Sequence, residues 1–390
     1  MEILFYRYNS ICEPALISAF TSFGITVHTE EQEMHDKQIT PGQCVEAVSG
    51  WIMKAPLAFV FSINFFPAIS YICERLKVPY VCWTVDSPVP ELFSNALGNA
   101  YNRIFLFDRA QYEFFSPVNP SCIHYLPLAA DNKQFEKAVL SMTEADYAAY
   151  GTDISFVGSL YTEKCRYDRL TLSDHTRGYV DGLMEAQLQI YGCNFIADSL
   201  TESVIHEIMD ADPLFYQGED LREGVERYLV AHQYVGMKLA ALERERTLRR
   251  LSEHFPVTLY TRSDTSSLPH VDCRGGVRTL TEMPKVFQAS RINLNMTIRP
   301  IETGLSQRVW DVLACGGFLL TNYQSEIPDY FEIGKELETY ESIPELEEKV
   351  RYYLSHEDER MEIAIRGYEK VAAHHSYEVR LAQMIKILTK

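Results

Sequence analysis

The chain has 390 residues, of which 46% are hydrophobic and 23% charged. A single hydrophobic core stops growing near ~250–300 residues, so the length predicts two domains, and the composition excludes general disorder. The formal net charge of -18 excludes nucleic acid and anionic lipid as general partners, because like charges repel. For the same reason, any bound diphosphate would need its own local cluster of hydrogen-bond donors.

Cysteine usage and hydropathy bear on the compartment. The nine cysteines form no C-x-x-C pair and match no zinc or disulfide pattern, which indicates free thiols in a reducing compartment. The opening MEILFYRYNS has charged residues inside its apolar run, so we read it as a strand rather than a signal peptide. The longest uncharged stretch, residues 55–73, is interrupted by prolines and an asparagine. We therefore expect a cytoplasmic protein with no integral membrane association.

The first third of the chain alternates short apolar runs with helical patterns. Strands are predicted at residues 3–8, 25–28, 57–63, 80–85 and 103–107, and helices at residues 13–23 and 67–77. Regular alternation of strand and helix predicts a parallel sheet with helices on both sides. The first domain is expected to cover residues 1–145, with a boundary between residues 131 and 151.

A second series of strands begins at residue 153. Strands are predicted there and at residues 257–261, 292–296 and 318–322. The helical stretch at about residues 165–250 is too long for one crossover, so it predicts a helical insertion. The second domain is expected to cover residues 146–376.

The segment RPIETGLSQRVWDVLACGGFLLTNYQ, residues 299–324, carries the clearest chemical signal. A glycine-containing loop leads into a helix predicted at residues 307–315, with Ser306 as its N-cap and Gly316 as its stop. Backbone N–H groups at a helix start attract anions. We expect a diphosphate to lie against this loop, whose candidate donor-binding residues are Thr303, Gly304, Leu305 and Ser306.

Three charged residues flank this loop. Arg299 and Arg308 could form charge-assisted hydrogen bonds with phosphate oxygens, and Asp311 could accept hydrogen bonds from ribose hydroxyls. Arg308 and Asp311 lie three residues apart on one helix, however, so a surface ion pair of little energetic consequence explains them equally well.

Two further loops belong to the candidate donor site. Arg262 follows the strand at residues 257–261, at the end of a strand where ligands bind in open α/β sheets. The backbone at Val277, in the Gly275–Val277 loop, could contact a nucleotide base. Ordinary turns explain both loops as well.

In the first half, Asp86 follows the strand at residues 80–85 and precedes two prolines. This position suits an acceptor site or a general base, and it also suits a turn or cap residue. The sequence has no H-E-x-x-H motif and no evident carboxylate pair, so we expect no metal site.

Several segments resemble the CgeB-like (spore maturation) glycosyltransferases. They are FVGSLY, LPLAAD, YVCWTVDSPVPELF and above all RVWDVLACGGFLLTNYQSEIPDYFEIGKELETY, and the resemblance covers nearly the whole chain. It implies an α/β protein with the GT-B fold, in which two Rossmann-like domains with parallel sheets face each other across a cleft. The C-terminal domain would bind the nucleotide and the N-terminal domain the acceptor. By this resemblance, the helix at residues 377–390 would pack on the N-terminal domain.

One departure from the wider retaining group concerns its two acidic residues, which lie eight positions apart. Asp311 matches the second position and would bind ribose. Thr303 occupies the first position, and Glu302 is adjacent but out of register. The sequence therefore leaves both an inverting and a retaining outcome open.

We expect a glycosyltransferase that moves a sugar from a nucleotide-diphosphate sugar, such as a UDP-sugar, to a protein or glycan acceptor. No cofactor or bound metal is expected, because Arg262, Arg299 and Arg308 could stabilise the departing diphosphate with the loop amides. Asp86 would act as the base if the reaction inverts the anomeric centre. Two alternatives stay open, a non-catalytic sugar-nucleotide-binding or scaffold protein and a GT-B nucleotide-sugar epimerase.

Overall fold

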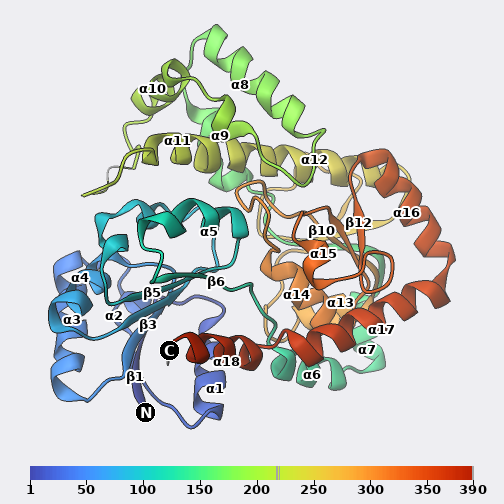
Figure 1. Ribbon diagram of the computed structural model, residues 1–390. Coiled ribbons are helices and arrows are strands. Elements are labelled where there is room, and N and C mark those ends of the chain that lie inside the picture. Colours follow the sequence, from blue (N-terminus) through green and yellow to red (C-terminus); the bar gives the residue numbers. More distant parts are fainter. Residues whose placement is uncertain (217, 219, 389–390) are drawn as a thin grey trace. The chain divides into compact units, whose positions relative to one another are not determined.

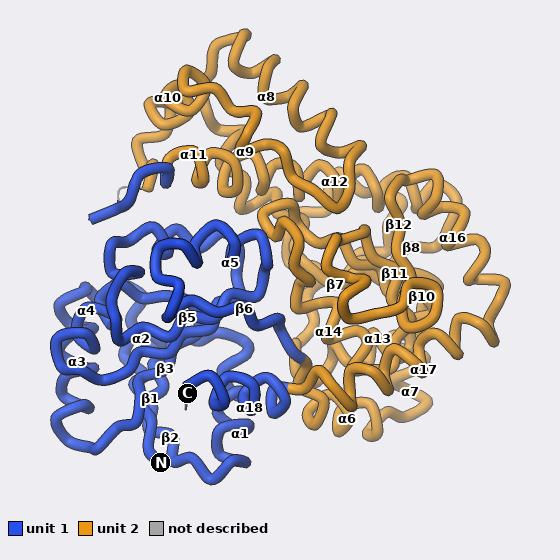
Figure 2. Tube along the Cα trace, in the orientation of Figure 1, with its two compact units in different colours: residues 1–129, 217–225, 377–390 blue, residues 130–216, 226–376 orange. Residues whose placement is uncertain are grey.

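The computed structural model describes residues 1–216, 218 and 220–388. The chain divides into two compact units, coloured separately in Figure 2. Unit 1 comprises Met1–Ala129, Gln217–Val225 and Tyr377–Lys390, and unit 2 comprises Ala130–Tyr216 and Glu226–Ser376. Residues 217 and 219 of the predicted insertion and the last two residues of the predicted C-terminal helix lie outside the described residues.

Unit 1 is built on a six-stranded sheet in the order β2-β1-β3-β4-β5-β6, with every neighbouring pair parallel. The strands are β1 (Glu2–Tyr6), β2 (Thr26–Glu30), β3 (Phe59–Ile63), β4 (Tyr80–Trp83), β5 (Asn102–Leu106) and β6 (Ile123–Tyr125). β3 and β4 are buried along their whole length, as their continuous apolar runs require. The predicted parallel sheet is confirmed.

The helices of unit 1 include the C-terminal helix of the chain. They are α1 (Glu13–Ser22), α2 (Gln32–His35), α3 (Pro41–Lys54), α4 (Pro67–Leu76), α5 (Arg109–Phe115) and α18 (Tyr377–Leu388), with short 3₁₀ turns η1 (Pro90–Phe93), η2 (Asn95–Gly98) and η3 (Ser116–Val118). In α18, the buried Arg380 donates through Nε to the carbonyl oxygens of Pro127 and Leu128, at 3.0 and 3.2 Å. The Tyr377 ring contacts Trp83 edge-on at 6.0 Å. These contacts attach α18 to the sheet of unit 1.

Unit 2 has its own six-stranded parallel sheet, in the order β12-β11-β10-β7-β8-β9. The strands are β7 (Thr152–Val157), β8 (Val257–Tyr260), β9 (Asp272–Cys273), β10 (Ser290–Asn295), β11 (Leu319–Asn322) and β12 (Glu338–Tyr340). The helices beside them are α6 (Asn132–Leu140), α7 (Glu144–Tyr150), α13 (Met283–Ala289), α14 (Gln307–Ala314), α15 (Ile327–Tyr330), α16 (Ile343–Ser355) and α17 (Glu357–His374) (Figure 1). Leu248, Leu346 and Ile363 pack with the strands in one buried cluster.

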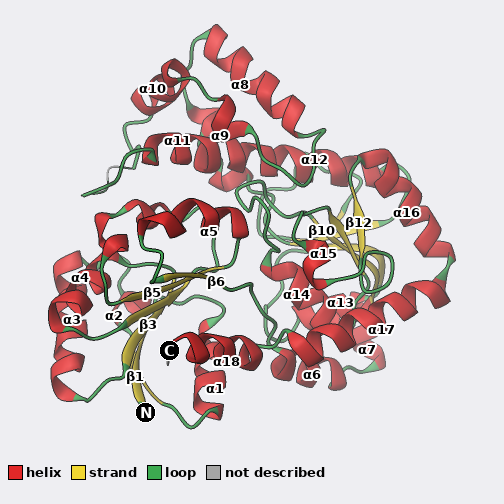
Figure 3. Ribbon diagram, viewed as in Figure 1, coloured by secondary structure: helices red, strands yellow, loops and turns green. Residues whose placement is uncertain are grey.

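The segment between β7 and β8 forms the predicted helical insertion. After two short 3₁₀ turns, η4 (Thr162–Lys164) and η5 (Tyr167–Arg169), it contains α8 (Asp174–Gln187), α9 (Ile196–Ser199), α10 (Glu202–Ala211), α11 (Val225–Leu229), the π-helix η6 (Val230–Gly236) and α12 (Met237–Ser252). Figure 3 shows helices joined by loops throughout this part of unit 2. None of the helices in the described part of the chain combines the length and apolar character needed to cross a membrane.

Candidate functional site

Helix α14 begins where the sequence predicts and ends one residue earlier, at Ala314. Ser306 is the N-cap residue, but its hydroxyl does not cap the first turn. It lies instead 3.1 Å from Thr297 Oγ1, at the end of β10. Gly316 ends the helix in the left-handed region, with φ 71, and its N–H donates to the carbonyl of Leu313 at 3.0 Å. The Ser306 hydroxyl therefore accepts no hydrogen bond from the first turn of α14, where the Val309 N–H donates to the Ser306 carbonyl at 3.0 Å instead.

Buried amide side chains at and just after the end of β11 hold the loop that leads into α14. Asn322 accepts from the Thr297 N–H at 2.8 Å and donates to the Thr297 carbonyl at 2.9 Å. Gln324 Nε2 donates to the carbonyls of Ile301 and Gly304, at 3.0 and 3.2 Å. The loop is thus bound along its inner side, which preorganises its backbone before any ligand arrives.

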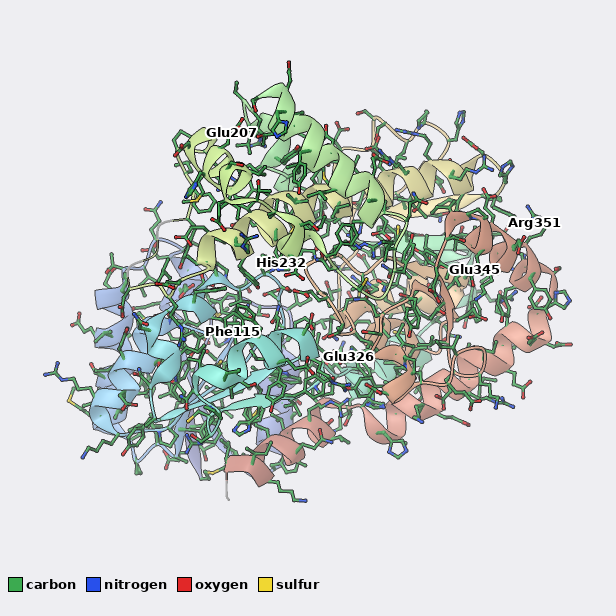
Figure 4. All side chains as sticks on the ribbon, turned by 45° about the horizontal axis from the view of Figure 1, so that its top comes forward. Phe115, Glu207, His232, Glu326, Glu345 and Arg351 are labelled. Carbon is green, nitrogen blue, oxygen red and sulfur yellow. The ribbon has the colours of Figure 1, made fainter. Side chains whose placement is uncertain are left out.

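The side chains of Thr303 and Leu305 contact the protein. Thr303 Oγ1 donates to Glu326 Oε1 at 2.7 Å, and Glu326, labelled in Figure 4, is buried. Leu305 is buried as well. What the loop offers a ligand at these positions is therefore chiefly its backbone.

Arg308 and Asp311 form the ion pair that their spacing allows, but the pair is largely buried. Arg308 Nη1 lies 3.1 Å from Asp311 Oδ2, and the side chains are 24% and 5% exposed. Gln307 Nε2 donates to the other carboxylate oxygen at 2.8 Å. Burial raises the pKa of Asp311 to about 6, although Arg308 opposes the shift. An exposed surface pair would show neither feature.

Arg299 lies beneath the loop and contacts the insertion. Its guanidinium is buried, lies 3.2 Å from Glu243 of α12 and donates to the carbonyl of Ile190 at 2.9 Å. It also lies over the ring of Tyr191, 4.6 Å from the centroid. The prediction that Arg299 contacts a phosphate stays a prediction. A phosphate bound there would compete with Glu243 for the Arg299 guanidinium.

The structure brings the two other predicted donor loops together. Arg262 is exposed after β8, and its side chain lies against Gly276, where an added Cβ would be 2.8 Å from Arg262 Cγ. Gly275 has φ 74, a left-handed conformation that glycine adopts readily. The half-buried Val277 follows directly. Arg262 and the backbone of residues 275–277 therefore border one surface.

Arg244 of α12 is a candidate that the sequence analysis missed. Its side chain is buried, and its two Nη atoms each donate to a carbonyl at 2.6 Å, those of Ser159 and Met296. These carbonyls follow β7 and β10, which are neighbours in the sheet. The guanidinium therefore lies at the carboxyl edge of the sheet, where open α/β folds bind their ligands.

Arg244 forms no ion pair with a carboxylate of the described residues. Among the described residues, no Asp or Glu oxygen lies within ion-pair distance of its guanidinium, and its buried Nε has no hydrogen-bond partner. Burial lowers the pKa of Arg244, and the Arg308 charge acts in the same direction, whereas Tyr161 and the Glu243 carboxylate oppose the shift. The ring of Tyr161, a residue in the left-handed region at φ 66, lies 4.6 Å away. A buried guanidinium without an ion-pair partner is stabilised by an anion beside it.

Periodicity could have revealed Arg244. Ala240, Leu248 and Leu251 of α12 are buried, and residue 244 lies on the same helical face. The alternating charges of ALERERTLRR, however, are typical of a solvated helix. They therefore obscure the position of Arg244 on the buried face.

In unit 1, Asp86 belongs to a polar cluster at the carboxyl edge of the sheet. Asn64, which follows β3 with φ 58, donates through Nδ2 to Asp86 Oδ2 at 2.7 Å and to Tyr8 Oη at 2.9 Å. Asn64 Oδ1 accepts from the Val85 N–H at 2.9 Å. Burial and the Asp86 charge raise the pKa of Tyr8. Asp86 itself is exposed, and a catalytic role for it stays a prediction.

The comparisons with known proteins follow this geometry. Residues 244–386 match the family model described as "Glycosyl transferase-like". No curated protein sequence matches the chain. Anabaena HepE in complex with UDP-glucose matches with a TM-score of 0.54 and 11% identity, over 100% of this chain and 99% of that chain. The chain has the GT-B fold.

Two other solved structures with GT-B architecture are similar to the whole chain. Sucrose-phosphate synthase from Thermosynechococcus elongatus matches with a TM-score of 0.56 and 12% identity, over 100% of this chain and 98% of that chain. A UDP-forming α,α-trehalose-phosphate synthase from Burkholderia xenovorans matches with a TM-score of 0.54 and 10% identity, over 100% and 98%. The expected fold class, α/β with two Rossmann-like domains, is confirmed.

Proposed function

We propose that the protein is a glycosyltransferase that transfers a sugar from a nucleotide-diphosphate donor, in the first instance a UDP-sugar. One observation carries the proposal: the buried Arg244, which forms no ion pair within the described part of the chain, lies at the carboxyl edge of the unit 2 sheet, with the Arg308 charge close to it. The chain as a whole is negatively charged, with a formal net charge of -18. Two neighbouring arginine charges in such a chain form a local positive site, which favours an anionic ligand. The family match over residues 244–386 supports the reaction class.

In this proposal each part of the site takes one part of the donor. The amides of Gly304, Leu305 and Ser306, in the loop just before α14, bind the diphosphate together with Arg308. Asp311 accepts the ribose hydroxyls. The remaining predicted donor residues, Arg262, Val277, Arg299 and Thr303, border the nucleotide and the sugar.

The chemical step needs charge stabilisation on the leaving diphosphate, and preorganised donors supply it without reorganisation. Arg244, Arg308 and the loop amides suit that role, so we propose transfer without a bound metal. In the described part of the chain, no three His, Cys, Asp or Glu side chains gather as a metal site. If the reaction inverts, Asp86 takes the proton of an acceptor hydroxyl in unit 1.

The finer assignments belong to the same proposal. The segments quoted above favour the CgeB-like glycosyltransferases, and a protein or glycan is the proposed acceptor. None of the nine cysteines, which all lie in the described part of the chain, forms a disulfide; this suits a reducing compartment, so we propose a cytoplasmic location.

A second candidate is a nucleotide-sugar epimerase. It is favoured by His232 and Glu302, which contact each other beside the donor loop. Epimerisation would consume the donor with no acceptor present, whereas a non-catalytic binding protein would leave the donor unchanged.

Thermal melting with UDP-, GDP- and ADP-sugars tests the proposal. A donor at ~100 times its Kd adds about 2.7 kcal/mol of stability, which gives a clear shift. Mass spectrometry of the stabilising donor, with and without candidate acceptors, then separates transfer from epimerisation and from simple binding. A nucleotide sugar that neither binds nor reacts in any combination would overturn the assignment.

A further inference from the structure

An asparagine of unit 1 joins the candidate base Asp86 to a tyrosine. Asn64 follows β3, and its side-chain amide contacts residues that follow the two neighbouring strands, β1 and β4. Nδ2 donates to Asp86 Oδ2 at 2.7 Å and to Tyr8 Oη at 2.9 Å. Oδ1 accepts from the backbone N–H groups of Val85 and Asp86, at 2.9 and 3.4 Å. The whole hydrogen-bonding capacity of this amide is therefore used within the cluster.

The neighbours of Asn64 fix the orientation of its amide. Backbone N–H groups only donate, so the amide atom that faces Val85 is the oxygen, and the nitrogen faces Asp86 and Tyr8. A carboxylate only accepts, so Asp86 Oδ2 is held by the amide N–H. In the described part of the chain, Asp86 Oδ1 has no hydrogen-bond partner, and the residue is exposed. The carboxylate is thus held by one oxygen and keeps the other for a substrate.

The backbone of Asn64 is held as firmly as its side chain. Its φ of 58 lies in the left-handed region, where asparagine is enriched among non-glycine residues. Its N–H donates to the Trp83 carbonyl at 2.9 Å, and its carbonyl accepts from the buried Ser62 hydroxyl at 2.7 Å. Tyr80 Oη lies 2.6 Å from the same hydroxyl. Residues held in this conformation by their surroundings cluster at active sites.

Tyr8 belongs to the cluster as a neutral phenol. Burial and the Asp86 charge raise its pKa, so the hydroxyl keeps its proton at neutral pH. Glu13 acts in the same direction, but Glu13 is paired with Arg7. Asp86 forms no ion pair among the described residues, and its hydrogen bond from Asn64 is therefore the contact that holds the carboxylate.

We propose that Asn64 is a positioning residue, which holds the Asp86 carboxylate so that, in an inverting transfer, its Oδ1 takes the proton of an acceptor hydroxyl. This inference rests on the proposed function. The acceptor oxygen loses its proton to Asp86 Oδ1 and bonds to the anomeric carbon of the donor sugar. The bond from that carbon to the diphosphate breaks, and its electron pair leaves with the diphosphate. Asn64 acts only through Asp86, because a general base must be oriented to take its proton.

The test uses UDP-glucose with water as the acceptor, because water needs no acceptor pocket of its own. UDP release by the full chain is followed from about pH 4 to about pH 9, on either side of the ordinary carboxyl and histidine ranges. Glycine adopts the left-handed conformation readily, so Asn64→Gly removes the amide without straining the backbone. We expect its kcat to fall about 10- to 100-fold with a donor KM within about twofold of wild type, because the base loses its orientation.

Asn64→Asp separates positioning from loop structure. The new carboxylate keeps an acceptor for the Val85 N–H, loses the N–H donors and adds a negative charge beside Asp86. Two adjacent carboxylates retain a proton to higher pH, so the acid limb of the pH–rate profile should move up by about one pH unit or more. A residue that only supported the loop would leave this profile where it is in wild type.

A double-variant cycle shows whether Asn64 acts through Asp86. In Asp86→Asn, the additional Asn64→Gly change should lower the rate by less than about twofold, since no base is left to orient. Lys77→Gly is the matched control, because Lys77 is the exposed C-cap residue of α4 and has the same φ of 58. It should leave kcat and the pH profile unchanged.

Every outcome decides the inference. Equal losses from Asn64→Gly in the wild-type and Asp86→Asn backgrounds overturn it, as do an unshifted profile in Asn64→Asp and a product of retained anomeric configuration. A wild type that binds UDP-glucose but releases no UDP, with water or with methyl glucoside as acceptor, overturns it and leaves donor binding intact. A wild type that does not bind UDP-glucose contradicts the proposed UDP donor, and the inference falls with it.

Discussion

Arg308 Nη1 lies 3.1 Å from Asp311 Oδ2 across one turn of α14, and the carboxylate is the more deeply buried partner. Burial raises the pKa of Asp311 to about 6 from an ordinary value of 3.8. The pair is therefore fully charged only above about pH 6. A site that uses Asp311 to accept ribose hydroxyls should work best in that range.

The first prediction concerns pH. A carboxyl group whose pKa is raised in the folded state stabilises the protein below its unfolded pKa, and this contribution is lost as pH rises through the folded pKa. As pH rises from about 4 to about 6, the Asp311 contribution should make the free energy of unfolding fall by roughly 2–3 kcal/mol. Asp311→Asn should lack this part of the pH dependence, measured by urea denaturation. Equal pH profiles for the two proteins would contradict the buried state of Asp311.

Ligand affinity should depend on pH in the opposite direction. The charged carboxylate is the better acceptor, so UDP-glucose should bind more tightly as pH rises through about 6. UDP-glucose is the right probe, because its diphosphate is esterified at both ends and does not titrate in this range. Calorimetry on wild type and Asp311→Asn checks this, and a pH-independent wild type would argue against a ribose contact.

The next prediction concerns Arg244. Only two of its five N–H groups are used by the Ser159 and Met296 carbonyls, so the others are donors for a diphosphate. Arg244→Met should weaken UDP binding by about 10- to 100-fold while uridine binding is unchanged, because only the phosphates need the cation. Arg246→Met is the control, since Arg246 lies on the same helix, 47% exposed and paired with Glu185. Equal losses for UDP and uridine would indicate damage to the fold.

A separate prediction addresses Asp86. If it is the general base, Asp86→Asn should lower kcat by about 100-fold or more, with little change in donor affinity. NMR of the anomeric proton gives the stereochemical outcome of the same reaction. Asp36→Asn, at another exposed aspartate of unit 1, is the control. An unaltered rate, or retention at the anomeric carbon, removes Asp86 from proton transfer.

The last prediction concerns two helical glycines of unit 2. In α17, a Cβ on Gly367 would lie 2.2 Å from the backbone oxygen of Glu336 and 2.8 Å from a Leu313 methyl. Gly367→Ala should therefore destabilise the protein by about 1–3 kcal/mol or more. In α8, nothing lies within 4 Å of such an atom on Gly178, so Gly178→Ala should stabilise the protein by about 0.5–1 kcal/mol. Urea denaturation measures the free energy of unfolding of both variants. If the two substitutions changed it equally, the packing of α17 would be contradicted.

Local chemistry made α14 predictable. An N-cap residue, an apolar face and a glycine stop lie within residues 306–316, and each acts on its immediate neighbours. The same information does not show that the Ser306 hydroxyl contacts Thr297 rather than the first-turn amides. That choice depends on β10, which the loop must approach in three dimensions.

The charged residues of the site show where prediction from sequence stops. Arg299 and Arg244 are both buried, yet Arg299 pairs with Glu243, whereas Arg244 donates to two backbone carbonyls. Their spacing in the chain does not distinguish them. His232 was not considered at all, because its carboxylate partner is seventy positions away.

The amino-acid sequence by itself determined the parallel sheet of unit 1, the helical insertion and helix α14, because apolar periodicity and end signals act over a few neighbouring residues. Only the tertiary structure decided which charged groups lie inside and whether each one meets an opposite charge. The cost of burying a charge depends on the atoms around it, and in unit 2 those atoms come from α12, β7, β10 and the loop after β10, which are far apart along the chain.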